Sequence, residues 1–227
     1  MKRVDRENEI FEVLQEFVEK GLDFVVVGGY GVSAYEHRFS VDADLVIRKE
    51  DLDRFVEILK DKGFEEEDNR ELDVYGGRYV AYVKDKELPV TIDLLVDKLK
   101  CRQTDASWSY KHFREHSVEK TIDGSEESVK VRVPEKELLI AVKLHSGRRT
   151  DARDVVALAD NIDPEQVLKH LDRGDRGKLQ DILEKIDERT RSEEFEDSFK
   201  GVFSQGQLPD EKIERVTQTI KRYLDRG

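Results

Sequence analysis

The distribution of strand-like and helix-like segments constrains the fold of this 227-residue chain more than any other feature. Before about residue 150, short apolar runs rich in β-branched residues alternate with amphipathic segments whose apolar residues recur every three or four positions. Beyond that point only the helical period remains. The pattern predicts an α/β (α+β) domain over residues 1–150, with a mixed β-sheet flanked by helices, and a helical C-terminal domain over residues 151–227.

The same periods predict the individual elements. Strands are expected over residues 24–27, 40–47, 74–83, 88–96 and 129–133, with a charged turn at 84–87. Helices are expected over residues 5–20, 31–37, 51–62, 134–146, 152–160, 164–171, 177–190 and 209–224. A polar turn is expected after Gly63, a surface loop with short helical or strand pieces over 104–124, and a polar gap before 209.

Composition excludes several classes of protein. Hydrophobic residues make up 37% of the chain, yet no run approaches the roughly 18 apolar residues that a membrane-spanning helix needs. The charged N-terminus lacks an apolar signal-peptide core, so we expect a cytoplasmic protein with no membrane partner. The net charge of −12 repels bulk nucleic acid unless basic groups are concentrated locally or metal ions intervene.

Three aspartates stand where carboxylates are costly. Asp42 and Asp44 open a strand, and because alternate residues of a strand share a face, both side chains project to the same side. Asp93 interrupts the apolar run Ile92–Val96, which is typical of an interior strand. If the two strands are neighbours, the three carboxylates meet, and Mg²⁺ is the cation that suits such hard oxygen ligands. Two ions held in this way form the metal clamp of phosphoryl and nucleotidyl transfer.

A glycine pair follows the first predicted strand. Gly28 and Gly29 carry no side chains, so their backbone N–H groups can approach a triphosphate. Arg38 and Ser40 precede the paired acids and could add a charge and a hydroxyl donor to the same anion. These four residues are therefore candidate nucleotide-binding residues.

Taken together, these motifs resemble a known family. Residues 28–29, 38–45 (Arg-Phe-Ser-Val-Asp-Ala-Asp-Leu) and 91–94 (Thr-Ile-Asp-Leu) resemble the glycine pair, the paired acids and the third acid of the nucleotidyltransferase superfamily with the DNA polymerase β-like fold. Residues 138–144 and 148–154 are similar to the AbiEii-like branch, the toxin-type nucleotidyltransferases of type IV toxin–antitoxin systems. The resemblance covers about residues 20 to 160, and the C-terminal helices carry no recognisable motif.

The resemblance implies a role for each matching residue. Asp42 and Asp44 would bind both magnesium ions, Asp93 the catalytic one, and Lys143 would approach the nucleotide phosphates. Many members of the superfamily have Gly-Ser where this chain has Gly28-Gly29, so a serine contact to the triphosphate is absent here. All three acids are present, which argues against an inactive relative.

The expected function is that of a Mg²⁺-dependent enzyme that transfers an NMP from an NTP to an acceptor hydroxyl. The acceptor could be an RNA such as a tRNA 3′ end, a protein hydroxyl or a small molecule, and the AbiEii-like resemblance implies a toxin-type component with an antitoxin partner. One alternative is a regulatory module that binds nucleotide without turnover.

Two further alternatives concern single motifs. Gly29, Gly31 and Ala34 fit the G-x-G-x-x-G/A spacing of a dinucleotide-binding oxidoreductase, but such a fold places its acid at the end of the second strand, not at its start. Lys143 could pair with a nearby acid, Asp151 or Asp154, instead of binding phosphate. Among the five histidines only His112 and His116 have a spacing that loosely fits metal ligands. We expect this pair to lie at the surface.

Overall fold

The computed structural model describes residues 3–74, 76–84, 88–203 and 210–226, and the chain divides into two compact units. The first unit comprises residues 1–99 and 108–134, and the second comprises residues 100–107 and 135–227. The division therefore falls after Pro134, whereas the sequence pattern placed it after residue 150. No helix in the described part of the chain combines the length and the apolar character needed to cross a membrane.

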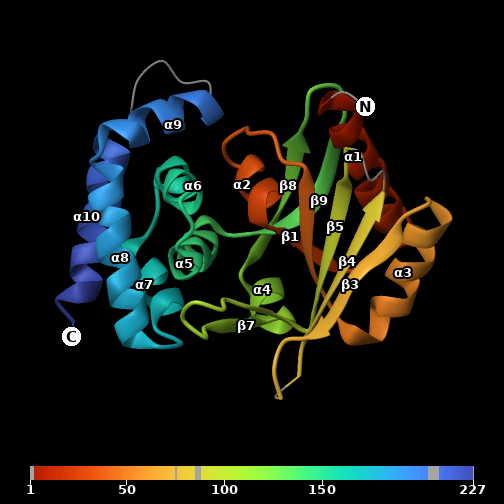
Figure 1. The fold of residues 1–227 in the computed structure, drawn as a ribbon, viewed down its shortest axis with the longest axis horizontal. Helices are drawn as coiled ribbons and strands as arrows, with labels where there is room; N and C mark the ends of the chain where they lie inside the picture. The colour runs from red at the N-terminus through yellow and green to blue at the C-terminus, as the bar shows by residue number, and fades with distance from the viewer. Residues whose placement is uncertain (1–2, 75, 85–87, 204–209, 227) are drawn as a thin grey trace. The chain divides into compact units, whose positions relative to one another are not determined.

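Five strands form the sheet of the first unit, in the order β1-β2-β5-β4-β3 (Figure 1). Their bounds are β1 (Phe24–Val27), β2 (Asp42–Ile47), β3 (Glu65–Glu71), β4 (Arg78–Lys84) and β5 (Val90–Val96). β2 and β5 run parallel, and the other neighbouring pairs run antiparallel. The predicted mixed sheet flanked by helices is confirmed.

The prediction of a polar turn after Gly63 is wrong, because this segment forms the edge strand β3. Its sequence, Glu-Glu-Glu-Asp-Asn-Arg-Glu, has no apolar residue and therefore no alternation to detect. Charged side chains suit an exposed edge because they oppose pairing with another chain. The neighbouring strand β4 also begins four residues later than predicted, at Arg78, and most of the predicted turn, residues 85–87, lies outside the described residues.

One face of this sheet packs against two helices, α1 (Arg3–Glu19) and α3 (Leu52–Asp61). Phe17 of α1 and Phe55 of α3 meet edge to face, with ring centroids 4.8 Å apart, and both contact Phe24 of β1 in the same way. Such aromatic pairs add about 0.5–1.5 kcal/mol each beyond their buried area. Since strand side chains alternate, Leu45 and Leu94 point into this core, and the residues on either side of them point to the opposite face.

The remaining elements of this part of the chain are short. They are α2 (Gly28–Ser33), the 3₁₀ turn η1 (Lys49–Asp51), β6 (Lys98–Lys100), β7 (Ser107–Ser109), α4 (Tyr110–Glu115), β8 (Ser117–Asp123) and β9 (Ser128–Pro134). β8 and β9 form an antiparallel hairpin. The helix predicted over 31–37 begins instead at Gly28, because the φ of +60° at this glycine lets the chain turn directly out of β1.

The second unit is helical, as predicted. Its helices are α5 (Lys136–Ser146), α6 (Asp151–Leu158), α7 (Pro164–Leu171), α8 (Arg176–Thr190), α9 (Glu193–Phe203) and α10 (Asp210–Leu224). Helix α9 replaces part of the predicted polar gap, and residue 209, the predicted start of the last helix, lies outside the described residues. The buried residues of α9 are Phe195, Phe199 and Phe203, a spacing of four that would have indicated an amphipathic helix.

Candidate active site

The topology of the sheet brings the three aspartates to one edge. β1 is antiparallel to β2, so the end of β1 meets the beginning of β2, and Val27 lies opposite Asp44. β5 is parallel to β2, and the register places Asp44 directly beside Asp93. Asp42 lies two residues before Asp44 on the same face, which is the face opposite the helical core. Asp42, Asp44 and Asp93 are called the carboxylate trio below.

Gly28 makes room for the middle member of this trio. A Cβ atom at Gly28 would overlap Oδ2 of Asp44 and lie 2.8 Å from its Cγ. The positive φ of Gly28 also disfavours any other residue. The glycine at the end of β1 is therefore required by the position of an acid on the neighbouring strand, which is a packing reason that the sequence alone did not supply.

The surroundings of Asp93 strongly perturb the pKa of its carboxyl group. Burial, followed by the negative charges of Asp44 and Asp42, raises the pKa of Asp93 to about 7. A hydrogen bond from the Tyr79 hydroxyl opposes this shift. Oδ1 of Asp93 is buried and has no hydrogen-bond partner among the described residues. A cation or a proton at this oxygen would remove the cost of an unpaired buried charge.

Asp42 is more exposed than the other two members. Burial of its carboxyl group raises its pKa, while the charge of Arg6 and a hydrogen bond from the Thr91 side chain lower it. Within the described part of the chain, the trio does not form a set of ligand atoms that all lie within 4.8 Å of one another. Rotation of at least one side chain is therefore needed before all three carboxylates can contact one ion.

The trio nevertheless fits a divalent metal ion. Its donors are carboxylate oxygens, which Mg²⁺ prefers, and one of them is buried without a partner. The acids repel one another, as the raised pKa of Asp93 records, so bound positive charge would be favourable. Gly28 leaves space for the Asp44 carboxylate within this group.

Arg38 and Ser40 lie against the second glycine of the pair. A Cβ atom at Gly29 would overlap Oγ of Ser40 and lie 2.9 Å from Nη2 of Arg38. The loop that carries both residues is fixed by α2, because the Tyr30 hydroxyl donates to the Ser40 carbonyl at 2.9 Å and Ser33 Oγ donates to the Arg38 carbonyl at 3.0 Å. The structure thus brings together Gly28, Gly29, Arg38, Ser40 and the carboxylate trio in one unit.

Lys143 lies in the other unit, on α5. Its Nζ is 3.1 Å from Oδ1 of Asp151 and 2.7 Å from Oδ2 of Asp154, and its side chain is only 12% exposed. Both carboxylates are almost fully buried, so the lysine balances two negative charges inside the helical unit. The pairing alternative considered for Lys143 is therefore observed. A contact of Lys143 with nucleotide phosphates stays a prediction.

Sequence analysis missed two polar neighbours of the trio. Thr91 contributes a hydrogen bond to Asp42, and Tyr79 of β4 contributes one to Asp93. Thr91 could have been found, because it lies two residues before Asp93 and therefore on the same face of the strand. Tyr79 could not, since its position depends on the pairing of β4 with β5.

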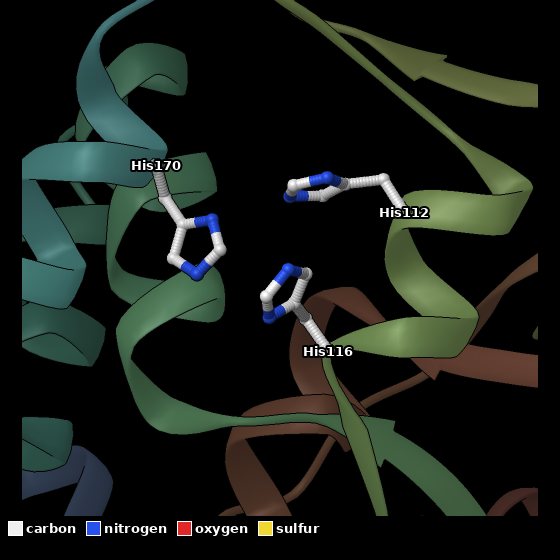
Figure 2. A group of neighbouring side chains, drawn as sticks. All are labelled: His112, His116 and His170. Carbon is white, nitrogen blue, oxygen red and sulfur yellow. The ribbon is translucent and has the colours of Figure 1, made fainter.

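Figure 2 shows the histidines that have a loose metal-ligand spacing. The rings of His112 and His116 lie 4.6 Å apart at the end of α4, and both side chains are half-buried. The expectation of surface histidines is thus correct only in part. His170, also drawn in Figure 2, belongs to α7 of the other unit, where its Nε2 is 3.2 Å from Oε1 of Glu135.

Comparison with known proteins finds similarity only in structure. No protein-family model matches the sequence, and no curated protein matches it. The antibiotic-resistance factor ANT(2'')-Ia superposes with a TM-score of 0.50 at 16% identity, over 72% of this chain and 88% of that one. The lincosamide antibiotic adenylyltransferase LnuA, bound to lincomycin, gives 0.49 at 18% identity, over 69% of this chain and 98% of that one. JHP933 from Helicobacter pylori gives 0.47 at 15% identity, over 99% and 92%.

The chain has a nucleotidyltransferase-type fold. At these identities the likeness concerns the fold alone. The sheet itself argues against the dinucleotide-binding alternative, because a Rossmann unit requires its first two strands to be parallel, and here β1 and β2 are antiparallel. The G-x-G-x-x-A spacing after β1 therefore does not mark a dinucleotide site.

Proposed function

We propose that this protein transfers an NMP from an NTP to an acceptor hydroxyl, using Mg²⁺ held by the carboxylate trio. The observation that carries the proposal is the direct register of Asp44 with Asp93 on parallel neighbouring strands, with Asp42 on the same face. Nucleotidyl transfer uses such a group of acids because both the attacking and the leaving oxygens develop negative charge. The resemblance of the motifs and the type of fold support the same reaction.

Each residue of the site has a role in the proposed reaction. Gly28 and Gly29 allow the triphosphate to approach the backbone, and Arg38 and Ser40 donate hydrogen bonds to its oxygens, with Lys143 as a further proposed phosphate contact. Bound Mg²⁺ would neutralise charge on the phosphate oxygens and lower the pKa of the acceptor hydroxyl.

The bond changes in the proposed reaction are balanced. A new bond forms between the acceptor oxygen and the α-phosphorus, and the bond between the α-phosphorus and the oxygen bridging to the β-phosphorus breaks. Pyrophosphate leaves with that bridging oxygen, and water takes up the hydroxyl proton. The residues of the trio hold the reacting groups in place and are not themselves modified.

The decisive experiment supplies each α-labelled NTP with Mg²⁺ to the full chain, together with total RNA, lysate protein or a small-molecule extract. Label in one of these fractions identifies the class of acceptor. The Asp42→Asn/Asp44→Asn variant should transfer nothing, and Glu71→Gln, a neutralised acid on the exposed edge strand, should behave as the wild type. Wild-type turnover by the double variant would contradict the proposal, and tight NTP binding without pyrophosphate release would indicate the regulatory module.

The toxin-type role is a finer part of the proposal. It predicts that the labelled acceptor is a cellular RNA or protein, that expression slows growth, and that a neighbouring antitoxin relieves this effect. Label in the small-molecule fraction alone, without an effect on growth, would instead indicate an enzyme that modifies small molecules.

A further inference from the structure

A pocket in the helical unit concentrates positive charge in a chain whose net charge is −12. The pocket lies among the residues of α6, α8, α9 and the segment before α6, and has a volume of about 390 Å³. Figure 1 shows these helices as neighbours in the C-terminal part of the chain. Four cationic side chains line it: Arg149, Arg153, Lys185 and Arg189. We call it the basic pocket.

When no anion is bound, repulsion between these closely spaced cations lowers the stability of the folded chain. Lys185 and Arg189 are four residues apart on α8, while Arg153 lies on α6 and Arg149 just before that helix. Residues four apart on a helix are neighbours, and like charges in this relation destabilise it. Arg149 and Arg153 line the same pocket and add further repulsion. Stability of the fold therefore does not explain the arrangement.

Acidic neighbours compensate only part of this charge. Glu194 pairs with Arg149 at 2.7 Å, and Glu188 is the other acid at the pocket. Lys185 and Arg189 have no carboxylate within 4.0 Å among the described residues. The lining thus carries two more positive than negative charges.

Uncharged donors complete the lining. Arg153 donates to Oγ of Ser198 at 2.9 Å, and this serine and Ser192 both line the pocket. Guanidinium, ammonium and hydroxyl groups around a concave space are the donors that bind phosphate groups. The volume of the basic pocket lies in the range of small-molecule binding sites. It is too small for an extended nucleic-acid strand.

From these observations we propose that the basic pocket binds a small anion with at least two phosphate groups, such as free pyrophosphate or the phosphate chain of a nucleotide. The binding is held by Arg153, Lys185 and Arg189 and needs no metal ion. It does not depend on the proposed transfer reaction, because none of these residues has a role in the site proposed for that reaction.

The test is calorimetric titration of the full chain with pyrophosphate in the presence of a chelator. We expect one site in the wild type and an affinity lower by roughly tenfold or more in Lys185→Gln/Arg189→Gln, since two charge-assisted hydrogen bonds are lost. The matched control, Lys169→Gln/Lys221→Gln, removes two exposed lysines from α7 and α10 and should bind as the wild type does. The Asp44→Asn variant should also bind normally.

Folding of the pocket variant is checked by its melting temperature without ligand, which should not fall, because repulsion is relieved. A parallel titration with ATP in the presence of the chelator distinguishes a nucleotide from free pyrophosphate as the ligand. Competition between ATP and pyrophosphate supports a nucleotide, and binding of pyrophosphate alone supports the free anion. The proposal is overturned if neither ligand binds, if the pocket variant binds as the wild type does, or if binding disappears in Asp44→Asn instead.

Discussion

Replacing Asp93 with asparagine should stabilise the metal-free protein at neutral and alkaline pH. The pKa of Asp93 is raised from 3.8 to about 7 by burial and by the neighbouring acids. In the folded chain this carboxyl group therefore holds its proton between these two values, whereas the unfolded chain has already released it. Wild-type stability consequently falls as the pH rises from about 4 to about 7.

The magnitude follows from the size of the pKa difference. About three pKa units correspond to about 4 kcal/mol above pH 7, and because the side chain keeps some exposure we expect about 2–4 kcal/mol. Asparagine has nearly the same shape, keeps an oxygen that can accept the hydrogen bond from Tyr79, and carries no charge. Below about pH 4 the two proteins should be nearly equal in stability, since the wild-type carboxyl is then neutral in both states.

The assay is urea unfolding with a chelator present, over a range from about pH 4 to about pH 8. The difference in unfolding free energy between Asp93→Asn and the wild type should grow with pH, while Glu71→Gln on the exposed edge strand should show no such growth. A variant less stable than the wild type at about pH 8, or a difference independent of pH, would refute the claim that the carboxylates repel one another.

Three further predictions concern other parts of the chain. Gly28→Ala should lower the unfolding free energy by about 1–3 kcal/mol and weaken Mg²⁺ binding, because it combines a positive φ with overlap on the Asp44 carboxylate; unchanged urea midpoint and calorimetric affinity would contradict this. Burial lowers the pKa of His145 from 6.5 to about 4, so between these pH values the unfolded chain binds a proton that the folded chain does not. The unfolding free energy should therefore fall by about 3 kcal/mol as the pH drops through this window. Urea titrations of His145→Asn should no longer show this pH dependence. Lys143→Met should cost about 3–5 kcal/mol in urea unfolding, because its two aspartate partners are left buried and unpaired; a loss no larger than that of Lys143→Arg would be inconsistent with the pairing.

Much of the sheet could be predicted because its inner strands carry a strong apolar signal. β1, β2 and β5 are buried runs of Val, Ile and Leu, and the two interruptions at Asp44 and Asp93 were already conspicuous in the sequence. The exposed strand β3 has no apolar residues, so no pattern distinguished it from a loop. The start of α2 depended on the positive φ of Gly28, which periodicity does not report.

The candidate site could also be predicted only in part from the sequence. The types and spacing of the acids predicted that they could share a cation, but only the strand order brings Asp44 beside Asp93. Glycine is required at position 28 because any side chain there would overlap Asp44 on the neighbouring strand β2. No local sequence pattern encodes this contact. The basic pocket was not predicted either, because its cations come from segments far apart in the chain.

The central claim is that Asp42, Asp44 and Asp93 together hold divalent cations, and Mn²⁺ binding followed by electron paramagnetic resonance tests it most directly. At about pH 8, above the pKa of about 7 of Asp93, the carboxyl group of this residue is largely ionised. The wild type should then remove free Mn²⁺ from solution, and Asp44→Asn and Asp93→Asn should each do so far less. Equal uptake by the wild type and both variants would contradict the account.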